Sequence, residues 1–304
     1  MNCYTSIFAS VNRQSAVALG CFDGVHIGHS KIISKTVDVA KENSLASVVW
    51  SFQAPPKSIM TNELKSLTSF SEKKKLVRSF GVDVFICVPF NEKISKLSPR
   101  DFFVDILVNQ LNAKHIFCGF NYRFGYNGSG NVELLRLMCD EFDIELTVFD
   151  EIKLDDVTVS SSAIRSYLLE GELEKAEKML GRPFSLYGKI KDGQHLGRKL
   201  GFPTINQELS ADKLLIKNGV YLTRVKFGNN IKYGITNIGW RPTVEGKFPI
   251  CETHILDFSG NLYGKYVTVE FVKFIREEKK FNSLEELTAQ VQRDMDIVRK
   301  IIKK

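Results

Sequence analysis

The feature that most constrains the fold of this chain is a series of short apolar runs separated by helical patterns. The runs lie in the first half of the chain and read SAVALG, LASVVWSF, VDVFICV, AKHIFCGF and IELTVF. Short valine-rich runs without alternation are typical of strands that are buried on both faces. Strands that alternate with helices form a parallel sheet, and such sheets bind ligands at the carboxyl ends of their strands. The first half is therefore predicted to be an α/β domain.

The hydrophobic pattern changes after residues 182–184. The segments FSLYGKI, GVYLTRVKF, IKYGITNIG, ICETHILDF and YVTVEFVKF have strand composition, and turns containing Gly and Asn separate them. Successive strands joined by turns predict an antiparallel barrel or sandwich. We therefore expect an α/β domain at residues 1–182 and an all-β domain at residues 183–304.

Helical patterns flank the strands of the second domain. Two short helices are predicted at residues 163–181, where Gly171 and Gly181 supply the stops. The final segment predicts a helix that begins with a capping box of Ser283 and Glu286. Five apolar residues of this helix recur on one face and are expected to pack against the strands: Leu284, Leu287, Val291, Val298 and Ile302.

Composition excludes several classes of protein. Apolar residues make up 43% of the chain and charged residues 25%, which is typical of a globular protein with a packed core. The net charge of +7 is spread without a dense basic run, so it suits anionic ligands such as nucleotides and argues against a nucleic-acid partner. No apolar run approaches the roughly 18–20 residues of a membrane span, so no membrane partner is expected. The sequence allows an oligomer without specifying one.

The cysteines and the N-terminus indicate a location. Six cysteines are scattered along the chain and no two form a CxxC pair, which favours free thiols over a disulfide framework. The first residues, MNCYTSIFASVNRQ, lack the basic start and apolar block of a secretory signal. We expect a cytoplasmic protein.

The turn GCFDGVHIGH follows the first predicted strand and carries two histidines, His26 and His29. Three interpretations are open. The histidines could bind a metal together with Cys21 and Asp23, although this spacing matches no common zinc pattern. They could also be incidental residues at the start of a helix. In the third interpretation they bind an anion, because a Gly-rich turn before a helix presents backbone N–H groups and the positive end of the helix dipole.

Two further segments carry residues that suit phosphate chemistry. VSSSAIR places serines before a helix and Arg165 one turn later, which forms either a plain N-cap or a second anion cradle. GFPTIN places Thr204 and Asn206 at alternate positions of an extended segment, so their oxygens share one face and suit Mg²⁺; an ordinary polar turn is the alternative. The preceding residues 188–193 lack the Lys-Ser/Thr pair of a P-loop, which excludes that motif.

Together these segments resemble a known family. GCFDGVHIGH resembles the HxGH signature of nucleotidyltransferases, and its longer form is similar to that of the bacterial FAD synthetases, which join a riboflavin kinase to an FMN adenylyltransferase. GFNYRFGYNGSG, VSSSAIR, GFPTIN, TNIGWRPTV and the segment beginning CETHILDF are similar to further motifs of this family, in the same order. The resemblance implies a Rossmann-like nucleotidyltransferase domain, followed by a small antiparallel riboflavin kinase barrel with a terminal helix.

The resemblance also implies roles in adenylyl transfer for residues of the first domain. His26, His29 and Arg165 would stabilise charge while the FMN phosphate attacks the α-phosphorus of ATP, and Asn121 would contact the flavin. The residues expected to bind ATP or its phosphates, in both domains, are Gly20, Phe22, Asp23, Gly24, Ser160, Ser161, Ser162, Gly193 and Gly197. The implied ligands are riboflavin, FMN, FAD and ATP as co-substrate.

For the second domain the resemblance implies a kinase site. Glu252 would act as the base near the accepting hydroxyl, while Thr204 and Asn206 would hold Mg²⁺. Glu252 alternates with apolar neighbours on a predicted strand, where an isolated acid more often faces solvent. Arg276 would contact the phosphorylated flavin product.

The chain departs from the family pattern at several positions. Relatives often carry F-[ED]-P-H-P after the second strand, whereas this chain has Gln53 in place of the acid and Pro55 in place of the histidine. Ser162 replaces a threonine, and Ile205 replaces an alanine. The missing histidine leaves open a flavin- or nucleotide-binding regulatory protein with weak or lost adenylyltransferase activity. A third alternative, a basic barrel that binds RNA, would show a steep salt dependence of binding.

Overall fold

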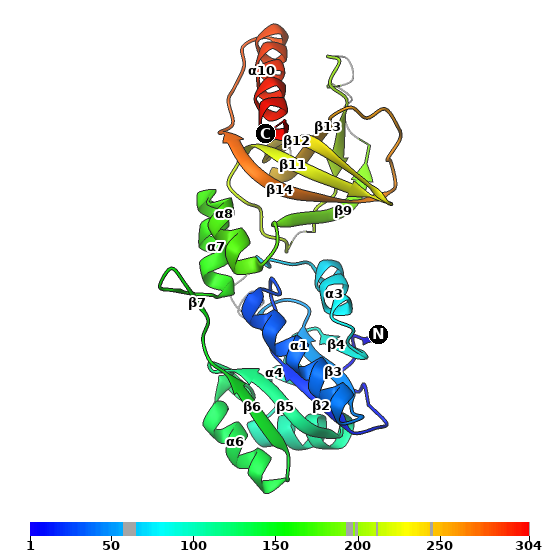
Figure 1. The fold of residues 1–304 in the computed structure, drawn as a ribbon, viewed down its shortest axis with the longest axis vertical. Coiled ribbons are helices and arrows are strands. Elements are labelled where there is room, and N and C mark those ends of the chain that lie inside the picture. Colours follow the sequence, from blue (N-terminus) through cyan, green and yellow to red (C-terminus); the bar gives the residue numbers. More distant parts are fainter. Residues whose placement is uncertain (57–64, 193–196, 198–199, 211, 244–245, 304) are drawn as a thin grey trace. The chain divides into compact units, whose positions relative to one another are not determined.

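The computed structural model describes residues 1–56, 65–192, 197, 200–210, 212–243 and 246–303 (Figure 1). By their contacts these residues form two compact units, Met1–Ala163 and Ile164–Lys304. Residues 164–182 group with the second unit by contacts, whereas the sequence pattern assigns them to the first domain. The boundary near residue 182 stays a prediction.

The first unit is built on a parallel sheet with the strand order β1-β4-β3-β2-β5-β6. Its strands are β1 (Asn2–Tyr4), β2 (Ser15–Leu19), β3 (Ala46–Phe52), β4 (Val84–Val88), β5 (Ala113–Gly119) and β6 (Glu145–Phe149). The five apolar runs form β2 to β6, which confirms the predicted sheet, and β1 adds a short edge strand that the sequence did not reveal. The strand order reverses between β2 and β5, and such a switch point opens a crevice at the carboxyl ends of the two strands.

Helices cover both faces of this sheet and bury two apolar layers. α1 (Ile27–Glu42) and α3 (Phe70–Ser79) pack on the face that carries Ala16 and Ala18 of β2 (Figure 1). The opposite face, with Val17 and Leu19, packs on α6 (Val132–Glu141) and on the π-helix Phe102–Gln110. β2 therefore has no solvent-facing side, which explains its unbroken apolar run. The remaining short elements are α4 (Glu92–Ser95), α5 (Pro99–Asp101), η2 (Tyr126–Gly128), β7 (Lys153–Leu154) and β8 (Val157–Thr158).

The predicted pair of short helices is present as α7 (Ser161–Glu170) and α8 (Leu173–Leu180). Gly171 and Gly181 follow the two helices with φ angles of 86° and 71°, a left-handed conformation that glycine adopts without strain. The N–H of Lys217 donates to the carbonyl of Leu168 at 3.0 Å, which ties α7 to the second unit.

The rest of the second unit is a closed antiparallel barrel with the strand order β10-β13-β12-β11-β14-β9, in which β9 also pairs with β10. Its strands are β9 (Ser185–Lys191), β10 (Thr204–Gln207), β11 (Gly219–Phe227), β12 (Asn230–Thr243), β13 (Gly246–Ile255) and β14 (Tyr266–Arg276). Three fully buried threonines, Thr223, Thr236 and Thr253, form a chain of hydroxyl hydrogen bonds across β11, β12 and β13, each 2.8 Å long. The barrel, rather than the sandwich, is thus the fold of this unit.

The terminal helix α10 (Leu284–Ile302) covers the outer face of β11 and β12 and buries Val298 against Val220 and Leu222. Two details differ from expectation. Leu284 is 50% exposed, because it lies on the first turn of the helix, beyond the apolar cluster beneath it. Ser283 caps the helix, but the Glu286 carboxylate accepts the N–H of Asn282 instead of that of Ser283, so only half of the predicted capping box forms.

Candidate functional site

The turn GCFDGVHIGH lies at the carboxyl end of β2, beside the switch point of the sheet. Phe22, Gly24 and Val25 adopt φ angles of 48°, 84° and 41°, and the two non-glycine residues cost about 1–2 kcal/mol each in this conformation. The Phe22 and Val25 side chains are fully buried, and their packing offsets that strain. A Cβ at Gly20 would lie 2.9 Å from the Phe22 ring, so only glycine lets this ring fold back under the turn.

Segments from elsewhere in the first unit hold this turn in place. The carboxylate of Asp23, which is 2% exposed, accepts the N–H groups of Leu67 at 2.9 Å and of Thr68 at 3.2 Å. The N–H of Gly24 donates to the Thr68 hydroxyl at 3.2 Å, and the Ser161 hydroxyl donates to the Asp23 carbonyl at 2.8 Å. These contacts give Asp23 a positioning role, and its predicted contact with ATP stays a prediction.

The two histidines stack on each other at the start of α1. Their ring centroids lie 3.6 Å apart, and the Nδ1 atom of His26 accepts the N–H of His29 at 3.4 Å. Because Nδ1 accepts, the neutral His26 ring carries its proton on Nε2, where it can be donated to a ligand. A Cβ at Gly28 would lie 3.3 Å from the His26 ring, so the glycine leaves room for the stack. A helix N-terminus with imidazole donors suits an anion.

The metal interpretation of this turn gains no support. Among the described residues, no group of three histidines, cysteines or acids is arranged to hold a metal ion. The Asp23 carboxylate, which that interpretation required, is already occupied by backbone N–H groups.

The other residues predicted for adenylyl transfer lie on two segments. The Ser160 hydroxyl accepts the N–H of Ala163 at 3.2 Å, as expected of an N-cap, and Arg165 is buried on α7. Asn121 comes two residues after β5, the other strand of the switch point, and its Oδ1 lies 3.6 Å from the Cβ position of Gly119. The Ser161 hydroxyl is hydrogen-bonded to the Asp23 carbonyl in the histidine turn. Contacts of Ser162, Arg165 and Asn121 with ATP or flavin remain predictions.

In the second unit, neighbouring strands bring the predicted kinase residues into one row on the outer face of the barrel. The strand register places Asn206 of β10 opposite Glu252 of β13, and Glu252 opposite Asn237 of β12. Directly opposed residues of antiparallel strands have Cβ atoms about 4.5–5.5 Å apart. Glu252 therefore lies between Asn206 and Asn237 across the three strands. The second of these, Asn237, was not identified as a site residue from the sequence, because only the strand register places it beside Glu252.

A cavity of about 240 Å³ lies over this face, between the barrel and α10. Its lining includes Thr204, Asn237, Glu252 and His254 from the barrel and Leu287 and Val291 from α10. Leu287 and Val291 are thus the part of the predicted apolar helix face that lines the cavity. Polar and apolar side chains both line the cavity, as expected of a pocket for a substrate with both kinds of surface.

The segment before β10 brings further polar groups to the cavity. A Cβ at Gly197 would lie 2.5 Å from the Phe202 carbonyl and 3.3 Å from the Thr204 hydroxyl, so glycine allows this close approach of the backbone. The Nδ1 atom of His254 donates to the Pro203 carbonyl at 2.9 Å, which fixes the start of the PTIN strand. Gly193, predicted to bind phosphate, lies outside the described residues. The hydroxyl of Thr204 and the amide of Asn206 are oxygen ligands of the kind that Mg²⁺ prefers, so these residues fit that ion.

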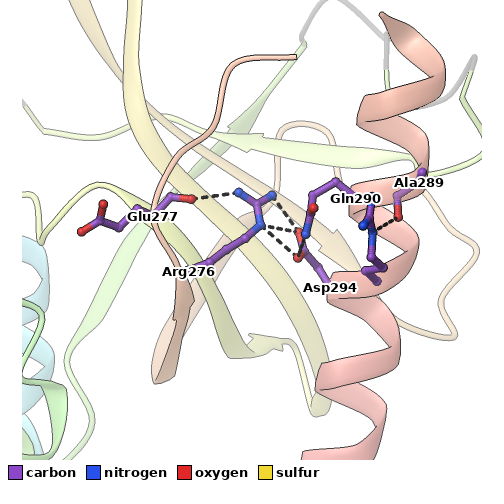
Figure 2. Close-up of polar contacts among 6 residues, drawn as sticks. Arg276, Glu277, Ala289, Gln290 and Asp294 are labelled. Carbon is purple, nitrogen blue, oxygen red and sulfur yellow. Dashed lines mark hydrogen bonds and ion pairs between the residues drawn. The ribbon is translucent and has the colours of Figure 1, made fainter. Parts of the chain in front are cut away.

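Arg276 lines the same cavity and is fixed by an ion pair (Figure 2). Its Nε and Nη2 atoms contact the carboxylate of Asp294 on α10 at 2.8–3.1 Å, and Nη1 donates to the Glu277 carbonyl at 2.9 Å. Gln290 donates to the same carboxylate at 2.9 Å. The pair joins the end of β14 to α10, and the predicted contact of Arg276 with the flavin product stays a prediction.

Comparison with known proteins finds two family models, one in each half of the chain. The FAD synthetase family model matches residues 8–163, and the riboflavin kinase family model matches residues 180–302. The bifunctional riboflavin kinase/FMN adenylyltransferase of Buchnera aphidicola subsp. Schizaphis graminum is 36% identical over 296 residues, which cover 95% of each chain. The chain belongs to this bifunctional family.

A second relative and a solved structure also match nearly the whole chain. The protein of the same name from Bacillus subtilis is 33% identical over 289 residues, 92% of this chain and 90% of its own. A solved structure from Streptococcus pneumoniae, described as a macrolide-efflux protein, matches with a TM-score of 0.87 and 27% identity over 98% of this chain and 99% of its own. The expected family, the enzyme class and the α/β-plus-barrel fold are confirmed, and the regulatory alternative is not supported.

No helix among the described residues has the length and apolar character needed to cross a membrane.

Proposed function

We propose that this chain makes FAD from riboflavin in two reactions at two separate sites. Residues 183–304 phosphorylate riboflavin to FMN, and residues 1–182 adenylylate FMN. The observation that carries the proposal is that two family motifs, one in each domain, coincide with built sites. The HxGH segment forms a stacked histidine pair at the switch point of a parallel sheet, and the PTIN segment stands beside Glu252 under the cavity.

In the kinase reaction, the terminal ribityl hydroxyl of riboflavin attacks the γ-phosphorus of ATP and ADP leaves. Glu252 accepts the hydroxyl proton, and the flanking amides of Asn206 and Asn237 orient its carboxylate. Thr204 and Asn206 would hold Mg²⁺, which neutralises phosphate charge when it is bound with ATP. The apolar side chains of Leu287 and Val291 in the cavity are suited to the flavin ring.

In the adenylyl transfer, an oxygen of the FMN phosphate attacks the α-phosphorus of ATP and pyrophosphate leaves. His26, through Nε2, and His29 donate hydrogen bonds to the phosphate oxygens as charge develops, and Arg165 adds a cation. The backbone of Gly20, Phe22 and Gly24 lines the ATP side of the site, together with the serines that begin α7. The helix N-terminus and the stacked pair supply these donors although Pro55 stands in the place of a third histidine.

We place the enzyme in the cytoplasm. All six cysteines are free thiols, and four of them, Cys87, Cys118, Cys139 and Cys251, are buried in the apolar cores or the barrel. Thiols distributed in this way are typical of a reducing compartment.

The test is to incubate the purified chain with riboflavin, ATP and Mg²⁺ and to separate the flavins by chromatography. Both FMN and FAD are expected; FMN alone would contradict the adenylyltransferase assignment, and no product would contradict both. His29→Ala is expected to stop FAD formation and spare FMN formation. Glu252→Ala is expected to stop the phosphorylation of riboflavin while supplied FMN is still converted to FAD.

A control variant distinguishes the site from general damage to the first unit. His115→Gln replaces a histidine in the amino-terminal half of β5, away from the carboxyl ends of the strands, and is expected to leave both activities within about twofold. Loss of both activities in either site variant would contradict two independent sites.

A further inference from the structure

The first unit contains a lysine with no solvent exposure, Lys73, on the first turn of α3. Its ammonium donates to the carbonyl of Cys21 at 2.9 Å and to that of Phe52 at 2.7 Å. Cys21 belongs to the histidine turn after β2, and Phe52 ends β3. Among the described residues, no carboxylate lies within ion-pair distance of this ammonium. Lys73 therefore places a buried positive charge directly behind the turn.

The bond to Cys21 controls the direction of the next peptide group. The Ser51 hydroxyl donates to the same carbonyl at 2.8 Å, so two donors hold it on the inner side of the turn. In a trans peptide the C=O and N–H groups point in opposite directions. The N–H of Phe22 consequently points away from Lys73, and within the described part of the chain it has no acceptor. The two donors thereby fix the Cys21–Phe22 peptide at the start of the histidine turn.

The charge itself also favours an anionic ligand. Taking a lysine out of water without a carboxylate is unfavourable, and two carbonyl dipoles offset only part of that cost. Its field reaches through a poorly screened interior. The same field acts on Cys87, where burial raises the thiol pKa to about 12 and the charge of Lys73 opposes that rise. An anion bound at the turn would balance the positive charge of Lys73, which no carboxylate of the described residues pairs with.

We propose that Lys73 is a positioning residue of the adenylyl-transfer site. Its ammonium fixes the Cys21–Phe22 peptide at the start of the histidine turn, and its charge is balanced by a polyphosphate, as in ATP or pyrophosphate. This inference rests on the proposed location of that site at the histidine turn. Lys73 does not touch the reacting atoms, and it acts through the turn that it holds.

The test uses Lys73→Met, which keeps the apolar stem and removes the charge and both hydrogen bonds. Pyrophosphate is the informative probe, because only the adenylyl-transfer reaction produces it. In the reverse reaction, which makes FMN and ATP from FAD and pyrophosphate, the KM for pyrophosphate is expected to rise about tenfold or more. The rise in unfolding temperature on adding pyrophosphate, measured from the variant's own baseline, is expected to shrink. The matched control, Lys74→Met, changes the same charge one residue along α3 and is expected to leave both values unchanged.

A purely structural role gives a different result. It would lower the unfolding temperature of Lys73→Met without ligand and leave the shift caused by pyrophosphate unchanged, which would overturn the inference. Ser51→Ala covers the case in which Lys73→Met does not fold. It removes the other donor to the Cys21 carbonyl without changing charge, and it is expected to raise the same KM about threefold. An unchanged KM in Ser51→Ala would overturn the proposed control of the peptide.

The outcome is distinguishable from failure of the proposed function. If the unaltered chain makes no FAD, the adenylyl-transfer assignment fails whatever Lys73 does. If the unaltered chain makes FAD, His29→Ala does not and Lys73→Met behaves normally, only the inference on Lys73 fails.

Discussion

The turn after β2 and the outer face of the barrel are the two sites proposed for phosphate chemistry, and they are built from different parts of the chain. In the turn, Phe22, Gly24 and Val25 take a left-handed path, and contacts from three remote segments hold it. On the barrel, the backbone is regular, and the register alone places Asn206 and Asn237 beside Glu252. The first site is thus a shaped backbone, whereas the second is a set of side chains on an ordinary sheet. Changes that are harmless in one should be damaging in the other.

The largest expected effect is on the side-chain pair that joins α10 to the barrel. Asp294→Ala leaves the partly buried guanidinium of Arg276 without its partner, which should lower the free energy of unfolding of the second unit by about 3 kcal/mol. Urea unfolding followed by circular dichroism measures this loss. The double variant Arg276→Met/Asp294→Leu should recover most of it, because no charge is left unpaired. A loss below about 1 kcal/mol in the single variant would show that this region does not depend on side-chain pairing.

The next largest effect is expected from a substitution that disturbs the backbone of the turn. Gly20→Ala forces the buried Phe22 ring to move, and a displacement of about 1 Å at the site should slow FAD formation about 100-fold. FMN formation from riboflavin should be unchanged. The control is Ile205→Ala in β10, a larger change in volume on a regular strand, which should alter FMN formation less than about threefold. A Gly20→Ala enzyme with normal FAD formation would contradict a site shaped by its backbone.

A smaller effect is expected inside the barrel, beneath the kinase face. Thr236→Val removes the central hydroxyl of the threonine chain and leaves those of Thr223 and Thr253 each with one partner fewer, at a cost of about 1–2 kcal/mol. Thr223→Val removes an end of the chain and should cost less. Thermal unfolding of the two variants gives the comparison. If the end variant proves the more damaging, the hydroxyl chain does not explain the packing.

The smallest effect concerns pH and the first unit alone. Burial lowers the pKa of His115 below the ordinary value of about 6.5, and Glu145 opposes this only in part. The unfolded chain therefore binds a proton at a higher pH than the folded chain. The stability contributed by the neutral ring is fully present above about pH 6.5 and is lost as pH falls through the lower pKa of the folded state. His115→Gln should flatten the fall in unfolding temperature over this range. An unchanged slope would mean that other groups cause it.

The comparison also explains what could be predicted from the sequence. The strands β2 to β6 and the barrel strands follow from local hydrophobic patterns, and Glu252 could be placed on a face because a strand alternates strictly. Asn237 escaped notice because its relation to Glu252 depends on pairing between strands, which no local pattern encodes. β1 has three residues and lies at the sheet edge, too short to leave a periodic signal.

In the turn, local patterns identify the residues but not their supports. The histidines and glycines of GCFDGVHIGH point to an anion site, whereas Thr68 and Lys73 bond to the turn from more than 40 positions away in the chain. Lys73 also belongs to a run of three lysines, a composition that normally indicates a solvated face. Its burial is a property of the tertiary structure.

The six thiols differ in burial, so an alkylating reagent should react with only some of them. Burial raises the pKa values of Cys87, Cys118, Cys139 and Cys251 to about 12, so these thiols stay protonated and unreactive at neutral pH. The other two, Cys3 and Cys21, are partly exposed, and Cys21 belongs to the histidine turn. A maleimide fluorophore should therefore react at Cys3 and Cys21 rather than at the four buried thiols. One of them is next to the peptide that Lys73 holds, where its emission would respond to nucleotide without any engineered cysteine.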